Sequence, residues 1–184
     1  MRKIFGHRGL PHIYEENTFK SLNKAQEICD FVETDVRITI DEELVLYHDA
    51  EIQTQKIEEL SLSEINELID IEISEKHLVS REQIKGDTNF ELKISSKDHD
   101  LNKVFLEKII NLTNPEDIVS SFDWEIILNN RESFKSKYGI LIDKENQLFE
   151  SKAMSNLDEK LMFMVEKEIF YSRNFDLPLE RCVV

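Results

Sequence analysis

Acidic residues stand at positions where a β-strand should be apolar. In the run VETDVRIT, Glu33 and Asp35 are two residues apart, so they point to one face of an otherwise β-branched strand. In NFELKI, Glu91 and Lys93 show the same spacing on a second strand. Carboxylates are costly to bury unless a cation joins them, and three that converge would suit a hard cation such as Mg²⁺ or Ca²⁺. The alternative is that these charges face solvent on an edge strand, paired with Lys or Arg.

Two histidines stand at the ends of predicted strands. His7 follows the run KIFG, and His48 ends the run LVLYH. Imidazoles in such places can serve as general acid and general base near neutral pH. Arg8 can hold a phosphate group bidentately, and Lys93 can add a point charge. The remaining histidines occur in polar or loop contexts and are interpreted as structural or surface residues: His12, His77 and His99.

Short apolar runs alternate with helical patterns, which is typical of an α/β fold. The predicted strands are Lys3–His7, Phe31–Ile38, Leu44–His48, Thr88–Ile94, Ile118–Ser121 and Gly139–Ile142. The predicted helices are Phe19–Ile28, one that begins after Ser61, Leu101–Leu112 and Trp124–Phe134. Leu161–Phe170 fits a buried strand or a helix, and Arg181–Val184 fits a final strand. Ser61 with Glu64 predicts a capping box, and Leu60 with Ile65 predicts a hydrophobic staple.

Successive strand–helix units predict a TIM-like (β/α) barrel that forms one domain over residues 1–184. The chain is shorter than the ~200 residues at the lower end of that fold, so we expect a barrel that is shortened or irregular at its C-terminal end. An open edge would need cover from the 145–184 segment or from a second subunit in a homo-oligomer.

The formal net charge of −15 argues against nucleic acid or an anionic membrane as partner, because both would repel the chain. A small anionic molecule fits only where local cations override that field. The sequence has neither a signal-peptide pattern nor a transmembrane segment. Cys29 and Cys182 are too few for a disulfide framework and are interpreted as reduced thiols of a cytoplasmic protein.

An ordered set of motifs resembles the signature of the glycerophosphodiester phosphodiesterase family. The motifs are HRG, EENT, ETDVRIT, DEELVLYHD and FELK, and the spacing from Asp35 to His48 agrees with the family pattern. SSFDWE and YGILID extend the resemblance to about residue 145. The resemblance implies a metal-dependent hydrolase that converts glycerophosphodiesters to glycerol 3-phosphate and an alcohol. It also implies attack by the neighbouring glycerol hydroxyl, followed by opening of a cyclic phosphate by water.

The resemblance assigns roles to individual residues. The implied metal ligands, for Mg²⁺ or Ca²⁺, are Glu33, Asp35 and Glu91. His7 and His48 match the acid–base pair. Arg8 matches the phosphate-binding arginine, and Lys93 matches a lysine beside the metal ligand. The supporting positions are Glu16 and Asn17, which are expected to order the first loop, and Asp49, which is expected to orient His48.

The chain also departs from the family pattern. A tryptophan-containing strand resembling WTVN and a final strand ending in Thr-Asp are not found, and the segment between His48 and Glu91 is short. Two alternatives therefore stay open. One is a non-catalytic remnant that binds phosphate or metal, and the other is a lysophospholipase-D-like activity, which would need an apolar approach to the site.

Overall fold

A computed structural model describes residues 4–94, 97–154, 158–171, 176–178 and 181–183. Its main element is an eight-stranded sheet with strand order β1-β2-β6-β7-β8-β9-β10 and with β3 paired to β2. The strands are β1 (Phe5–His7), β2 (Phe31–Ile38), β3 (Leu44–Leu46), β6 (Thr88–Leu92), β7 (Ile118–Ser121), β8 (Lys137–Ile142), β9 (Leu161–Val165) and β10 (Cys182–Val183). All neighbours on this path are parallel, and β3 alone runs antiparallel.

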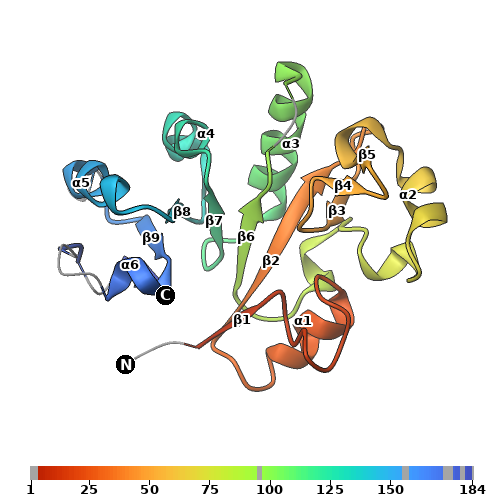
Figure 1. Cartoon of the computed structure of the whole chain (residues 1–184), viewed down its shortest axis with the longest axis horizontal. Coiled ribbons are helices and arrows are strands. Elements are labelled where there is room, and N and C mark those ends of the chain that lie inside the picture. Colours follow the sequence, from red (N-terminus) through yellow and green to blue (C-terminus); the bar gives the residue numbers. More distant parts are fainter. Residues whose placement is uncertain (1–3, 95–96, 155–157, 172–175, 179–180, 184) are drawn as a thin grey trace.

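The sheet curls into a partial barrel with helices outside it, which confirms the predicted shortened TIM-like barrel (Figure 1). Among the described strands, no pairing joins β10 back to β1. The segment after residue 145 extends the sheet through β9 and β10 (Figure 1).

The helices are α1 (Phe19–Ala25), α2 (Leu62–Leu68), α3 (His99–Leu112), α4 (Trp124–Asn129), α5 (Glu145–Met154) and α6 (Lys167–Phe170). The outward face of the sheet packs against them. Val36 and Phe90 from the strands join Phe105 and Ile109 from α3 in the main hydrophobic core. These side chains are at most 1% exposed, so this layer supplies much of the hydrophobic stabilisation of the barrel wall. No described helix is both long and apolar enough to cross a bilayer.

Residues 49–87, between β3 and β6, form an insertion whose small hydrophobic cluster also includes Val45 of β3. It contains the hairpin β4 (Glu51–Ile52) and β5 (Gln55–Lys56), three short 3₁₀ turns and α2. The capping box between Ser61 and Glu64 is confirmed, with reciprocal backbone hydrogen bonds. Leu60 and Ile65, the predicted staple, belong to the same buried cluster.

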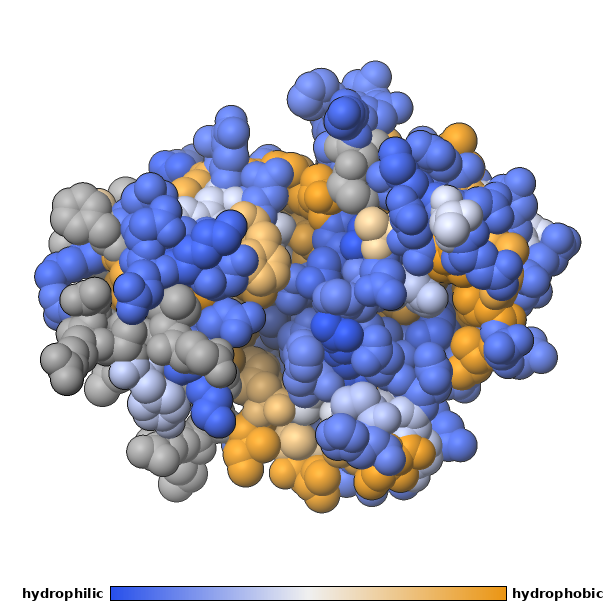
Figure 2. Space-filling model, viewed as in Figure 1, coloured by the Kyte–Doolittle hydropathy of each residue, from blue (hydrophilic) through white to orange (hydrophobic). Residues whose placement is uncertain are grey.

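The inner face of the sheet changes from apolar to charged along the strands. Phe31 and Ile118 form a buried cluster with Met164, and Phe5 stacks on Phe31 with ring centroids 4.9 Å apart. Gly139 lies close to this cluster, and a Cβ atom there would lie 2.9 Å from the Met164 methyl group, which would have to shift. Charged residues follow on the same face of β2. Figure 2 shows hydrophilic side chains gathered at the centre of the molecule over β2 and β6.

Several element boundaries differ from the sequence-based prediction. Strands β3 and β6 end two residues early, so His48 and Lys93 lie just beyond their strands. Helix α1 ends at Ala25, and α4 ends at Asn129 before a 3₁₀ turn. The 161–170 segment holds both predicted alternatives, a strand and then a helix. Lys3 and Val184 lie outside the described residues.

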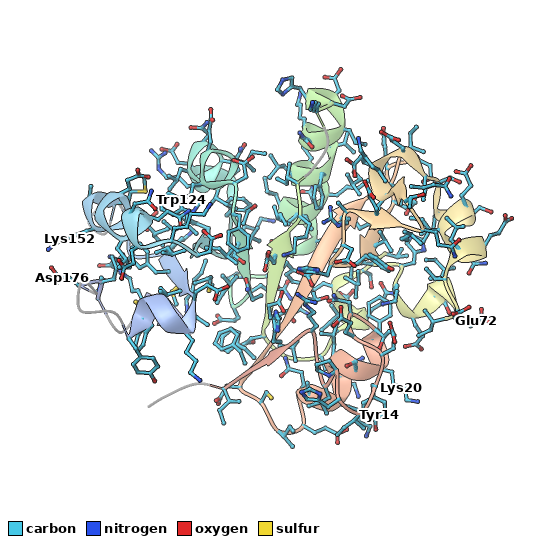
Figure 3. The ribbon with its side chains drawn as sticks, in the orientation of Figure 1. Tyr14, Lys20, Glu72, Trp124, Lys152 and Asp176 are labelled. Carbon is cyan, nitrogen blue, oxygen red and sulfur yellow. The ribbon has the colours of Figure 1, made fainter. Side chains whose placement is uncertain are left out.

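The β4–β5 hairpin and α5 were not predicted. Two-residue strands are too short to show an alternating pattern. Helix α5 has few apolar residues, with Leu148 as its buried hydrophobic anchor, so its sequence lacks a clear apolar stripe. Lys152 on α5 pairs with Asp176, which connects this helix to the C-terminal segment (Figure 3).

Candidate active site

Three carboxylates lie together at the centre of the sheet. Glu33 and Asp35 come from the inner face of β2, and Glu91 comes from β6, where it is the direct register partner of Asp35. One carboxylate oxygen from each residue lies within 4.8 Å of the others. All three are buried, with exposures of 6%, 0% and 5%. The structure therefore brings together the acidic residues that the strand patterns indicated, and it does not place them on a solvent-facing edge.

The chemistry of this cluster fits a bound divalent cation. Oε1 of Glu33 is buried and has no hydrogen-bond partner among the described residues. Burial, followed by the nearby charges of Asp35 and Glu91, raises the pKa of Glu33 well above its usual value. Burial also raises the pKa of Glu91. Buried oxygen ligands that lack a protein partner are what a hard cation such as Mg²⁺ or Ca²⁺ requires, so the residues present fit a metal ion.

Two cations of the chain face the same carboxylates. Asp35 lies 3.1 Å from Nε of Arg8 and 3.1 Å from Nζ of Lys93. Lys93 also pairs with Glu91 and lies 5.6 Å from the ring centroid of Phe122. Because these cations partly neutralise the cluster, they explain how three acidic groups can be buried side by side. They also supply the local positive charge that an anionic ligand needs in a chain of net charge −15.

The loop after β1 holds Arg8 in a constrained conformation. Arg8 has φ 55° and Asn17 has φ 52°, and the Asn17 amide donates to the Arg8 carbonyl over 3.2 Å. Nη1 of Arg8 lies 3.1 Å from Oε1 of Glu16. The side chain of Asn17 donates to Asp35 over 2.8 Å and accepts from the Asp35 amide. A positive φ at a non-glycine residue costs roughly 1–2 kcal/mol, so surrounding contacts must hold this loop in place.

Two histidines lie near the carboxylates: His7 is the last residue of β1, and His48 comes two residues after β3. Nε2 of His7 lies 3.7 Å from Oε2 of Glu33, while most of the ring is exposed. Partial desolvation, together with the charge of Arg8, lowers the pKa of His7. Nδ1 of His48 lies 2.8 Å from Oδ1 of Asp49. His48 is also close enough to Glu91 to influence its ionisation. The predicted histidines and their supporting residues therefore surround one site.

Arg37, on the same inner face of β2, was not predicted from the sequence to belong to the site. Arg37 is buried, and its guanidinium donates to the carbonyls of His48 (2.6 and 3.1 Å) and Lys93 (3.2 Å). It thereby connects His48, two residues after β3, to Lys93, which directly follows β6. The signal was present, because Arg37 continues the two-residue spacing of Glu33 and Asp35 along the inner face of β2.

The raised pKa of Glu33 makes the metal-free protein sensitive to pH. The folded state retains a proton that the unfolded state releases above the ordinary glutamate pKa of about 4.5. Stability without metal should therefore fall as pH rises from that value to the raised folded pKa. Glu33→Gln should remove this slope, stabilise the metal-free protein by about 1–2 kcal/mol and abolish stabilisation by added Ca²⁺. Urea unfolding across pH, with and without Ca²⁺, measures each effect. An unchanged pH slope in the variant would contradict this account.

The structure is a parallel-stranded partial barrel with an acidic cluster at its centre, and two histidines and two cations that suit a phosphate group lie beside the cluster. These features define a class of protein, the barrel-type phosphodiester hydrolases. Comparison with family sequence models gives the particular family. The model described as "Glycerophosphoryl diester phosphodiesterase family" matches residues 7–173, beyond the point near residue 145 where the recognisable motifs end. The chain belongs to this family.

Solved structures of the same family have the same fold. A glycerophosphodiester phosphodiesterase from Thermotoga maritima is 25% identical, with a TM-score of 0.64 and coverage of 96% of this chain and 93% of that chain. A glycerophosphodiester phosphodiesterase from Parabacteroides distasonis is 22% identical, with a TM-score of 0.61 and coverage of 89% and 83%. An Oleispira antarctica phosphodiesterase, solved with the product sn-glycerol-3-phosphate, is 17% identical, with a TM-score of 0.64 and coverage of 91% and 85%. A search of curated protein sequences gives no significant match.

Proposed function

We propose that residues 1–184 form a single catalytic domain that hydrolyses glycerophosphodiesters to glycerol 3-phosphate and an alcohol. One observation carries the proposal: the buried cluster of Glu33, Asp35 and Glu91, with an unpartnered oxygen on Glu33, lies beside His7 and within electrostatic reach of His48. The product named for the Oleispira relative has the chemistry expected from such a site. This activity would belong to glycerol and lipid metabolism. Cys29 and Cys182 are both thiols and not disulfide partners, which is in keeping with a cytoplasmic location.

The three carboxylates would hold Mg²⁺ or Ca²⁺, since both are hard cations that prefer oxygen ligands. When bound, the ion would polarise a phosphoryl oxygen as a Lewis acid. Arg8 would bind the phosphodiester through its planar guanidinium, and Lys93 would add a second positive charge. Both side chains already face the cluster, so little reorganisation is needed as negative charge grows on the phosphate in the transition state.

The histidines would move the protons. One imidazole accepts the proton of the attacking hydroxyl, and the other protonates the departing alkoxide. The attacking group would first be the neighbouring hydroxyl of glycerol and then a water molecule that opens the cyclic phosphate. Asp49 would fix the ring of His48 through its contact with Nδ1.

The experiment that tests this proposal is a turnover assay on metal-free and reconstituted protein. Glycerophosphocholine, glycerophosphoethanolamine and lysophosphatidylcholine would be offered with Mg²⁺, Ca²⁺ or EDTA. We expect glycerol 3-phosphate to be released from the first two, with EDTA lowering the rate about 100-fold or more. Saturating metal should also raise the melting temperature by about 5–10 °C.

The outcomes separate the alternatives. Stabilisation by metal and by glycerol 3-phosphate without any turnover would indicate a binding remnant and contradict catalysis. Faster cleavage of lysophosphatidylcholine than of either glycerophosphodiester would indicate a lysophospholipase-D-like activity. Turnover that persists unchanged in EDTA would contradict the proposed metal site.

A further inference from the structure

A lysine outside the proposed catalytic set is almost completely buried beside the site. Lys76 follows the 3₁₀ turn Ile73–Glu75 in the insertion and is 2% exposed. Burial lowers the pKa of Lys76, while the charges of Glu15 and Glu16 oppose that effect. Lysine is almost never fully buried without partners, because removing an ammonium group from water is costly. The burial of Lys76 therefore requires contacts that offset this desolvation cost.

Those contacts are backbone carbonyls of the loop after β1. Nζ of Lys76 donates to the carbonyl of Glu16 over 2.7 Å and to the carbonyl of Asn17 over 3.2 Å. The ammonium group also lies 5.5 Å from the ring centroid of Tyr47. Tyr47 comes directly before His48, so Lys76 touches both the loop that carries Arg8 and the segment that carries His48.

The backbone of the same segment is fastened to β3. The amide of Leu46 donates to the carbonyl of Lys76 over 2.8 Å, and the amide of Leu78 donates to the carbonyl of Leu44 over 2.9 Å. Next to Lys76, Oε2 of Glu75 accepts from the amide of Lys20 at the start of α1. Figure 3 labels Lys20 on α1, and Figure 1 shows the yellow segment after α2 beside that helix. The insertion is therefore joined to β3 on one side and to the β1–α1 region on the other.

The two residues that Lys76 holds are those that contact the charged centre. Glu16 pairs with Nη1 of Arg8, and the side chain of Asn17 donates to Asp35. Asn17 adopts a positive φ, a conformation that needs support from its surroundings. Without the ammonium group, the two carbonyls would lose this donor, and the loop would lose its direct link to the segment that pairs with β3.

We propose that Lys76 is a positioning residue, which fixes the Arg8–Asn17 loop relative to His48 and so sets the geometry of the metal and phosphate site. This inference rests on the proposed function for its effect on turnover, but its effect on the loop is independent of it. The insertion, which is short in this chain, would then hold the Arg8–Asn17 loop in place relative to the segment that carries His48.

The test compares Lys76→Met with Lys56→Met, a matched control in the same insertion. Lys56 is exposed and pairs with Glu59, away from the loop. In Lys76→Met we expect hydrogen exchange at the Asn17 amide to rise at least tenfold, and the affinity for Ca²⁺ alone to fall about 10- to 100-fold. Turnover of glycerophosphocholine should fall by a similar factor. Lys76→Arg, which keeps the donors, should recover much of each loss, and Lys56→Met should resemble the parent protein.

The inference would be overturned if Lys76→Met is less stable than the parent but keeps its Asn17 amide exchange rate and its Ca²⁺ affinity within about twofold of the parent values. If Lys76→Met does not fold, Tyr47→Leu removes only the ring that faces the ammonium group. It should shift both readouts in the same direction by a smaller amount, and unchanged readouts there would also overturn the inference. A parent protein without turnover would contradict the proposed function alone, because exchange and Ca²⁺ binding still test Lys76.

Discussion

Asp35→Asn is expected to lower phosphodiester turnover by about 10³-fold or more, and to weaken Ca²⁺ binding beyond detection at millimolar concentration. Asp35 is fully buried and contacts Arg8, Lys93 and Asn17. Asparagine keeps the shape of the side chain but removes the charge that these two cations face. The metal site would also lose one of its three carboxylates. Calorimetric Ca²⁺ titration beside a turnover assay measures both effects.

The stability of this variant separates Asp35 from Glu33. Because Asp35 is paired with two cations, its loss should destabilise the metal-free protein by about 3 kcal/mol, whereas Glu33→Gln should stabilise it. Asp117→Asn is the matched control, since Asp117 is buried and paired with Arg81 outside the site. The control should be destabilised to a similar extent and still bind Ca²⁺ like the parent. Equal loss of Ca²⁺ binding in both variants would show that instability, and not the lost ligand, is the cause.

His7→Gln and His48→Gln should each lower kcat by about 10²- to 10⁴-fold while Ca²⁺ affinity stays close to that of the parent. Glutamine retains hydrogen-bonding capacity near the ring position but cannot carry the proton through the reaction. His77→Gln is the matched control, because His77 pairs with Glu43 away from the carboxylates. It should leave kcat nearly unchanged. A His48 variant that keeps more than a third of the parent kcat would remove that histidine from the mechanism.

The strands and the centre of the site could be predicted because a parallel strand has a fixed two-residue alternation. Once β2 and β6 are placed side by side with their apolar residues on the outer face, Glu33, Asp35 and Glu91 share the inner face. The capping box at Ser61 could be predicted for a similar reason, because its contacts span only three residues. Local geometry was sufficient in both cases.

Lys76 could not be predicted in this way. It lies in a polar segment without periodicity, and its partners Glu16 and Asn17 are far away in the sequence. Its burial depends on how the insertion packs against the first loop, which is a tertiary property. The hairpin β4–β5 was missed because its strands have two residues each, and helix α5 was missed because its apolar residues form no clear stripe.

The central claim is that Glu33, Asp35 and Glu91 hold one divalent ion between the two histidines. A crystal structure of the protein with Ca²⁺ and glycerol 3-phosphate tests it most directly. The account predicts a single ion about 2.3–2.6 Å from an oxygen of each carboxylate, with the phosphate facing Arg8 and Lys93. An ion bound elsewhere, with the three carboxylates still paired only to Arg8 and Lys93, would contradict it.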